Sequence, residues 1–277
     1  MRIDSHQHYW RLERGDYHWM PADGPLHRDW LPADLAPLNL ASGIDGTIAV
    51  QAAQTVAETE FLLELANQPQ NSIVAVVGWV DLDSDHAAAD LERLAADPKL
   101  RAVRPMLQDL TDPAWILRPR VLDNLRLFAD LGLVYELLSY PGHLPYALQA
   151  IDRIPGVPVI IDHLSKPTYS SPPPDFWRTW MAHFAERDNT AVKISGMVTE
   201  VGRDWTADVV RPNAEAVIEL FGPDRVMFGS DWPVCVQAAD HARVVGLAEE
   251  LTSGLSAAEQ DAFWSGTATR YYGLDQS

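Results

Sequence analysis

Eight short runs rich in β-branched and other apolar residues recur along the chain, and this repetition constrains the fold more than any other feature. The runs span residues 2–8, 44–52, 73–81, 100–107, 133–138, 157–163, 190–195 and 225–231. Most are nearly continuous in apolar residues and do not alternate with polar ones. Because strands covered on both faces have this pattern, the runs predict a buried parallel sheet.

Segments of helical period separate the runs. Apolar residues recur at helical spacing in 58–66, 85–96, 120–131 and 175–187, and the capping box Ser256-Ala257-Ala258-Glu259 predicts the start of a last helix. Strand–helix alternation repeated eight times predicts an α/β protein with a closed (β/α)8 TIM-type barrel. No strand is followed by Gly-x-Gly-x-x-Gly, which argues against an open dinucleotide-binding sheet.

Two stretches interrupt the alternation and are predicted to be long loops after strands 1 and 6. Residues 10–40 are rich in Trp and Pro, and residues 166–174 read KPTYSSPPP. Barrel enzymes build their substrate pockets from loops at the carboxyl ends of the strands. No linker divides the chain, and 277 residues are enough for one large core, so we expect a single domain over 1–277.

The net charge of −18, from 21 Lys and Arg against 39 Asp and Glu, excludes several partners. Nucleic-acid binding needs a surplus of basic residues, and so does a basic membrane-binding patch. One cysteine, Cys235, cannot form an internal disulfide and is expected to be a packed residue, and no apolar leader opens the chain. We expect a cytoplasmic protein that acts on a small molecule, with homo-oligomerisation left open.

Ionisable residues close three of the predicted strands. His6 and His8 lie on one face of the first strand, His163 ends the sixth, and Asp231 ends the eighth. Such groups at the end of an apolar strand are costly unless they are satisfied or used. Together they suit a hydrolytic site, in which imidazoles bind a metal or polarise a carbonyl and a carboxylate takes a proton from water.

Six ordered motifs carry a resemblance to a known family. They read DSHQH at 4–8, GWVDL at 78–82, RAVR at 101–104, DHLSKP at 162–167, KISG at 193–196 with TE at 199–200, and FGPDRVMFGSDWPV at 221–234. They resemble the amidohydrolase-2 branch of the amidohydrolase superfamily. Within it, the chain is most similar to sugar-lactone hydrolases of the L-fuconolactonase and L-rhamnonolactonase type.

The resemblance implies a (β/α)8 barrel enzyme of carbohydrate metabolism that opens a sugar lactone by hydrolysing its carboxylic ester bond. It assigns Asp231 and His163 to catalysis and His6 and His8 to metal binding. Binuclear members usually carry a bridging Lys or Glu on the fourth strand, whereas the fourth strand here reads RAVRPML. We therefore expect one divalent ion, Zn²⁺ or Mn²⁺, or a metal-independent site in which His163 and Arg104 stabilise the oxyanion.

Four residues are candidate contacts for the substrate: Arg104, Glu136, Trp79 and Trp232. Arg104 either binds the lactone or product carboxylate or pairs with an acid, and Glu136 either hydrogen-bonds the substrate or forms a structural ion pair. An indole face packs well against the C–H face of a sugar. The tryptophans near predicted strand ends or in the first long loop are Trp10, Trp19, Trp30, Trp79 and Trp232.

The two lysines in the motifs have less specific interpretations. Lys193 lies within a buried strand and needs a partner carboxylate, so ion pairing inside the barrel is at least as expected as catalysis. Lys166 precedes a proline in the second long loop and is expected to be structural or exposed.

Two other functions stay open. The same His and Asp residues would serve a metal-dependent nonoxidative decarboxylase of an aromatic or muconate-type acid, although the sparse Arg and the acidic charge argue against a carboxylated substrate. A non-catalytic binding barrel is the remote alternative, because such a barrel has no physical need for four convergent ionisable groups.

Overall fold

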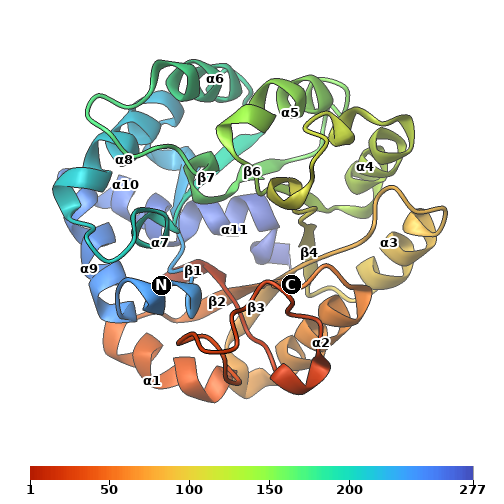
Figure 1. Ribbon diagram of the computed structural model, residues 1–277, viewed down its shortest axis with the longest axis horizontal. Helices are drawn as coiled ribbons and strands as arrows, with labels where there is room; N and C mark the ends of the chain where they lie inside the picture. The colour runs from red at the N-terminus through yellow and green to blue at the C-terminus, as the bar shows by residue number, and fades with distance from the viewer. Residues whose placement is uncertain (277) are drawn as a thin grey trace.

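The computed structural model describes residues 1–276, and in them eight parallel strands pair in chain order. Backbone hydrogen bonds from Asp231 N to His6 O (2.8 Å) and from His8 N to Trp232 O (2.7 Å) bring the last strand to the first. The sheet thus forms a barrel (Figure 1), which confirms the predicted fold. The strands are β1 (Ile3–Gln7), β2 (Gly46–Val50), β3 (Ile73–Gly78), β4 (Leu100–Val103), β5 (Val134–Leu137), β6 (Val159–Ile161), β7 (Thr190–Ile194) and β8 (Val226–Phe228).

Helices surround the barrel, as Figure 1 shows. The predicted capping box is present at the start of α10, where Ser256 and Glu259 bond each other's backbone. No helix in residues 1–276 combines the length and the apolar content needed to cross a membrane. The helices are α1 (Pro32–Ser42), α2 (Val56–Ala66), α3 (Ala87–Ala95), α4 (Pro119–Leu131), α5 (Leu144–Ile151), α6 (Asp175–Ala185), α7 (Met197–Val201), α8 (Ala207–Phe221), α9 (His241–Leu251), α10 (Ala257–Asp261) and α11 (Thr267–Tyr272).

The predicted loop over residues 10–40 is wrong beyond residue 31, where α1 begins. This helix has Pro32 in its first turn and Pro37 in its interior, and it has no continuous apolar stripe. Its sequence therefore lacked the helical period on which the prediction depended. The connection after β1 still runs over residues 8–31, and the connection after β6 continues to α6, so both predicted long connections are present.

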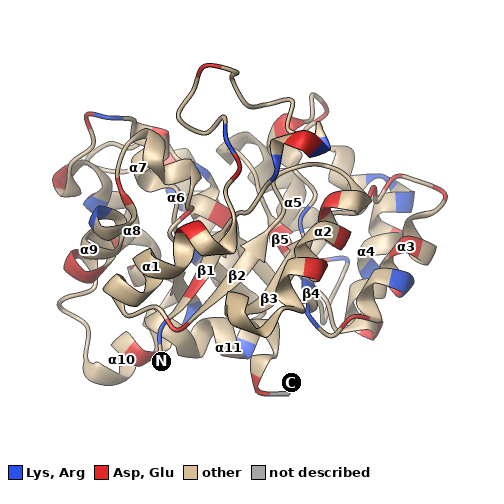
Figure 2. Cartoon of the chain, turned by 90° about the horizontal axis from the view of Figure 1, so that it is seen from below, with Lys and Arg blue, Asp and Glu red and all other residues tan. Residues whose placement is uncertain are grey.

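The two ends of the barrel differ. Side chains from the strands fill the lower interior, and Ala268 and Tyr272 of α11 pack against them. Both chain termini lie at this end, whereas the most extended loop rises from the opposite end (Figure 2). The carboxyl ends of parallel strands all meet at one rim of a barrel, so any polar group that ends a strand is brought to that rim.

Candidate active site

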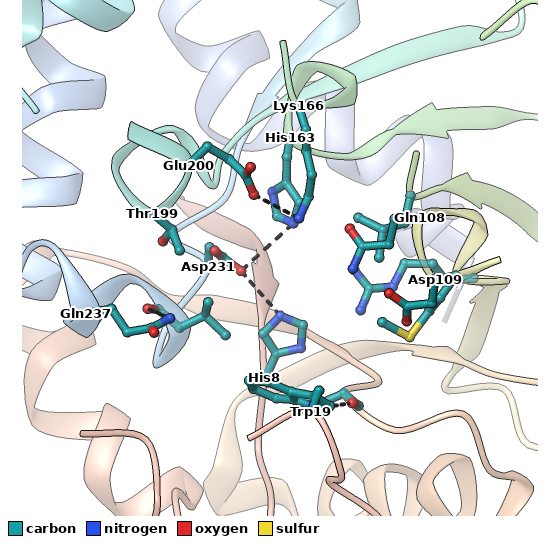
Figure 3. A pocket seen from close by; sticks show the side chains of 15 residues that line it. His8, Trp19, Gln108, Asp109, His163, Lys166, Thr199, Glu200, Asp231 and Gln237 are labelled. Atoms are coloured by element: carbon teal, nitrogen blue, oxygen red, sulfur yellow. Dashed lines mark hydrogen bonds and ion pairs between the residues drawn. The ribbon is translucent and has the colours of Figure 1, made fainter. Parts of the chain in front are cut away.

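Asp231, just beyond β8, is the centre of a cluster of three histidines. Its Oδ1 lies 3.3 Å from the Nε2 atom of His8, 3.8 Å from that of His6 and 3.9 Å from that of His163. All four side chains are buried. Figure 3 shows the Asp231 carboxylate between His8 and His163. The structure therefore brings together the four residues that the strand ends singled out.

The other ring nitrogen of each histidine has its own partner. The Nδ1 of His8 lies 2.8 Å from the carbonyl oxygen of Val50, to which it can only donate. The Nδ1 of His163 lies 2.8 Å from Ser195 Oγ, and that of His6 lies 3.4 Å from a carboxylate oxygen of Asp162. Partners of this kind fix the orientation of metal-binding histidines and keep the second nitrogen directed at the centre of the site.

The backbone is strained where the cluster is anchored. Residues 163–166 all have positive φ, between 47° and 55°, and Asp231 has φ 57°. The left-handed conformation costs a residue with a Cβ about 1–2 kcal/mol. Because strain of this kind concentrates at functional sites, it supports an active site at the ends of β6 and β8.

Gly196 leaves the space that the His163 ring occupies. A Cβ at residue 196, where φ is 68°, would lie 2.6 Å from His163 Nδ1. We expect Gly196→Ala to displace the imidazole and to lower kcat/KM by about 100-fold, the effect of a displacement of about 1 Å at a catalytic group. Gly132→Ala is the matched control, since Gly132 has φ 66° and nothing within 4 Å of the added Cβ. Equal losses in both variants would contradict this role of Gly196.

Burial and neighbouring charges set the protonation states of the cluster. Burial lowers the pKa of His163 to about 4 and lowers the pKa of His6 well below its usual range. Burial alone would raise the pKa of Asp231, but the interactions with His163 and His8 hold that pKa below its ordinary value. At neutral pH the site therefore holds an ionised carboxylate beside the neutral imidazoles of His6 and His163.

The cluster borders a cavity of about 260 Å³ at the carboxyl end of the barrel. This volume is at the small end of the range for small-molecule sites, about 300 Å³ upward. Most of the residues that line it carry polar or charged side chains, among them Arg104, Gln108 and Thr199. A wall of this kind suits a ligand that carries several hydroxyl groups.

A network of cations and carboxylates fills the barrel beneath the cavity. The ammonium of Lys193 lies 2.7 Å from Glu136 and 3.2 Å from Asp162, and Arg104 Nη1 lies 3.1 Å from Asp162. The hydroxyl of Tyr272 donates to the other oxygen of Glu136. His6, Glu136 and Asp162 form a second set of potential metal ligands in the described chain. Lys193 and Arg104 together already balance the charges of Glu136 and Asp162, so the structure favours one metal site over two.

The candidate substrate contacts are only partly placed at the cavity. Arg104 lines the cavity, as a substrate contact would. It also pairs with Asp162, as the alternative of an acid partner predicted. Glu136 is outside the cavity, and its ion pair with Lys193 is the structural alternative. Trp79 lines a neighbouring hollow, and Trp232, 1% exposed, packs against Trp30. These three expected substrate contacts are therefore not in the lining of this cavity, and their role in substrate binding stays a prediction.

The cavity wall also includes residues that the sequence did not place at the site. Lys166, expected to be structural or exposed, lines the cavity and forms an ion pair of 2.8 Å with Glu200 (Figure 3). Trp19 is the one tryptophan at the wall of this cavity in the described chain. Asp162 was given no role, although it is a carboxylate at the end of an apolar strand and could have been recognised from that position. Ser195 and Glu200 lie in the KISG and TE motifs of the family resemblance, but neither residue was given a role.

The donor set fits one divalent ion. One donor atom from each of His6, His163 and Asp231 lies within 4.8 Å of the other two. The Nε2 of His8 adds a further nitrogen beside the same carboxylate oxygen. Imidazole nitrogen and carboxylate oxygen are ligands that suit Zn²⁺ and also Mn²⁺.

A (β/α)8 barrel with one histidine on β1, a second just after it, a third after β6 and an aspartate after β8 is a scaffold for hydrolytic chemistry. We assign the protein to the class of barrel hydrolases. The family model for amidohydrolases, Amidohydro_2, matches residues 3–274. The chain belongs to this amidohydrolase family, as the sequence motifs implied.

Three relatives illustrate the similarity. The chain is 40% identical to an L-fucono-1,5-lactonase of Burkholderia ambifaria, over 84% of this chain and 80% of the relative. It is 38% identical to an L-fucono-1,5-lactonase of Burkholderia multivorans, over 100% of this chain and 97% of the relative. A crystal structure of an amidohydrolase from Burkholderia multivorans with bound zinc superimposes with a TM-score of 0.92, at 39% identity over 99% of both chains.

Proposed function

We propose that the protein hydrolyses a sugar lactone of the L-fucono-1,5-lactone type to the open-chain sugar acid. The observation that carries this proposal is the ionised carboxylate of Asp231, which faces three imidazole nitrogens at a small, polar-walled cavity. A carboxylate in this position can take a proton from water. The names of the two Burkholderia lactonases, which align with most of this chain, support the substrate class.

In the proposed reaction, Asp231 accepts a proton from a water molecule, whose oxygen attacks the lactone carbonyl carbon. A tetrahedral intermediate forms, and the bond from that carbon to the ring oxygen then breaks. The proton held on Asp231 passes to the departing ring oxygen, which leaves a free hydroxyl and a carboxylic acid. The acid then releases the second proton of the water to solvent and becomes a carboxylate. His8 donates its Nδ1 proton to Val50, so its Nε2 is free to orient the water beside Asp231.

Arg104 and His163 are the cavity groups that would stabilise the oxyanion. The Nε of Arg104 has no partner in residues 1–276, although the side chain is buried. Removing a preorganised donor of this kind typically lowers kcat by about 100- to 1,000-fold. A divalent ion held by His6, His8, His163 and Asp231 would supply Lewis-acid polarisation of the carbonyl and a more acidic water.

The cations at the cavity argue against the decarboxylase. Arg104 is paired with Asp162, and Lys166 is paired with Glu200. Each cation already has a carboxylate counterion, so the two pairs bring no net positive charge for a carboxylated substrate. A lactone is neutral when it binds, and it becomes an anion only on hydrolysis, so it needs no such cation.

The test of this function is acid release from a panel of aldono-1,5-lactones and aldono-1,4-lactones, followed with a pH indicator. Parallel reactions with hydroxybenzoates are monitored for CO₂. We expect saturable acid release from 1,5-lactones and no CO₂. Release of CO₂ without lactone hydrolysis would establish the decarboxylase instead.

The pH dependence follows from the protonation states. Asp231 must be ionised to accept a proton, and its pKa lies below the usual range. The pKa of His163 is about 4, so this ring stays neutral above that pH. We expect kcat/KM, corrected for uncatalysed hydrolysis, to be constant from about pH 7 down to about pH 5 and to fall only below it. An acid limb near about pH 6.5, the ordinary value for histidine, would contradict these protonation states.

Metal removal distinguishes the two versions of the site. If His6, His8, His163 and Asp231 hold an ion, dialysis against a chelator should remove at most one equivalent of Zn²⁺ or Mn²⁺ and lower the thermal midpoint, because an ion bound only to the native state stabilises it. The readouts are metal analysis, calorimetry and activity. Full activity in protein shown to be metal-free would leave only the version that relies on Arg104 and His163.

A further inference from the structure

Trp19 is an exposed aromatic side chain on the wall of the active-site cavity. It belongs to the long connection over residues 8–31, and 44% of its surface is exposed. Its indole nitrogen donates to the carbonyl oxygen of Ala52 at 2.7 Å, and its ring packs edge-on against Trp10. In Figure 3, Trp19 lies on the side of the pocket opposite Glu200. The indole is therefore held in one position although much of it faces the opening.

Glu58 connects the segments behind this wall through buried hydrogen bonds. This α2 side chain is completely buried. One carboxylate oxygen accepts a hydrogen bond from the Ala52 amide at 3.0 Å, and the other accepts one from the Tyr17 hydroxyl at 2.7 Å. The guanidinium of Arg14 lies 3.4 Å from the second oxygen. Glu58 thus joins two segments on either side of Trp19: residues 14–17 of its own loop, and Ala52, to which the indole donates.

The energetic cost of this arrangement is consistent with a positioning role. Burial raises the pKa of Glu58 to about 7, so ionising this carboxylate in the native protein is unfavourable. Burying a carboxyl group is expensive even when it is hydrogen-bonded, and apolar packing would fill the same volume at a lower cost. What the carboxylate contributes is two directed acceptors that fix the loop and Ala52 relative to each other.

We propose that Trp19 forms the sugar-binding wall of the active-site cavity and that Glu58 is its positioning residue, acting through Tyr17 and Ala52. This inference rests on the proposed function, because it takes the substrate to be a sugar ring with a C–H face. An indole face offers such a ring a large apolar surface. Trp19 binds the part of the ring that does not react, so its contribution is the same in the ground state and the transition state and is measured in KM.

Steady-state kinetics of lactone hydrolysis test the proposal. We expect Trp19→Ala to raise KM by about tenfold with little change in kcat, which corresponds to loss of an aromatic contact of about 1.4 kcal/mol. Trp19→Phe keeps an aromatic face but loses the hydrogen bond to Ala52, so its KM should lie between the two. Phe176→Ala is the matched control, because Phe176 is an exposed aromatic residue on α6 that lies outside the cavity.

The positioning role has its own variants. Glu58→Leu removes both acceptors and should raise KM more than Glu58→Gln, whose amide can accept from Ala52 and donate to Tyr17. Since Glu58→Leu could fail to fold, Tyr17→Phe provides the milder test, because it removes only the hydroxyl that bonds Glu58. We expect Tyr17→Phe to raise KM severalfold and to leave kcat near the wild-type value.

The outcomes separate this inference from the proposed function. An active wild type whose KM is unchanged by Trp19→Ala overturns the sugar-binding wall. A KM raised by Trp19→Ala but not by Tyr17→Phe overturns the positioning role of Glu58. Equal losses of kcat in the Trp19 variants and in Phe176→Ala show a general structural effect and also overturn the inference. A folded wild type that hydrolyses no lactone overturns the proposed function and this inference with it.

Discussion

Asp231→Asn should lower kcat for lactone hydrolysis by about 1,000-fold or more while the protein stays folded. Asparagine has nearly the same shape as aspartate but cannot accept a proton from water. The carboxylate also lies within 3.9 Å of three imidazole nitrogens, so the substitution removes the charge on which the cluster is centred. The measurement is the initial rate of acid release at saturating lactone, with circular dichroism as the check on folding.

Asp130→Asn is the matched control for this prediction, because Asp130 is an exposed acid on α4 far from the cavity lining. It changes the net charge by the same amount and should leave kcat unchanged. A value of kcat for Asp231→Asn within about tenfold of wild type would show that another group accepts the proton.

Lys193→Met should lower the free energy of unfolding by about 3–5 kcal/mol, the usual cost of removing one partner from a buried ion pair. The lysine is fully buried, with its ammonium 2.7 Å from Glu136 and 3.2 Å from Asp162. Asp162 keeps Arg104 as a partner, but Glu136 keeps only the hydroxyl of Tyr272. The measurement is urea denaturation followed by tryptophan fluorescence.

Two further variants sharpen this test. In Lys193→Met combined with Glu136→Gln, the unpaired carboxylate is removed, so part of the lost stability should return. Lys99→Met is the control, since Lys99 is partly exposed and its ammonium donates only to the carbonyl oxygen of Ile73. A loss below about 1 kcal/mol in Lys193→Met would mean that the interior tolerates the unpaired Glu136.

The parts of the structure that could be predicted from sequence depend on simple periodicities. Strands buried on both faces are continuous apolar runs, so all eight were visible. Because parallel strands end at one rim, His6, His8, His163 and Asp231 could be placed together without knowledge of the loops. The structure confirms that placement by the distances around Asp231.

The remaining features depend on three-dimensional packing that no local pattern encodes. Helix α1 was missed because it contains Pro37 and lacks an apolar stripe. Whether Glu136 reaches the cavity depends on its height along the barrel axis, which the sequence does not show. In the structure it lies in the barrel interior and pairs with Lys193. Five tryptophans had a similar sequence context, and only the path of the long loop decides that Trp19 reaches the cavity while Trp232 packs in the core.

In the proposed reaction, a water molecule held by Asp231 attacks the lactone carbonyl directly. The most direct test is a single turnover of L-fucono-1,5-lactone in ¹⁸O-labelled water, with enzyme in excess and the product acid analysed by mass spectrometry. Direct attack predicts one ¹⁸O atom in the carboxylate of the first product formed. An unlabelled first product, with the label in the Asp231 side chain instead, would show covalent attack by the carboxylate and would rule out direct attack by water.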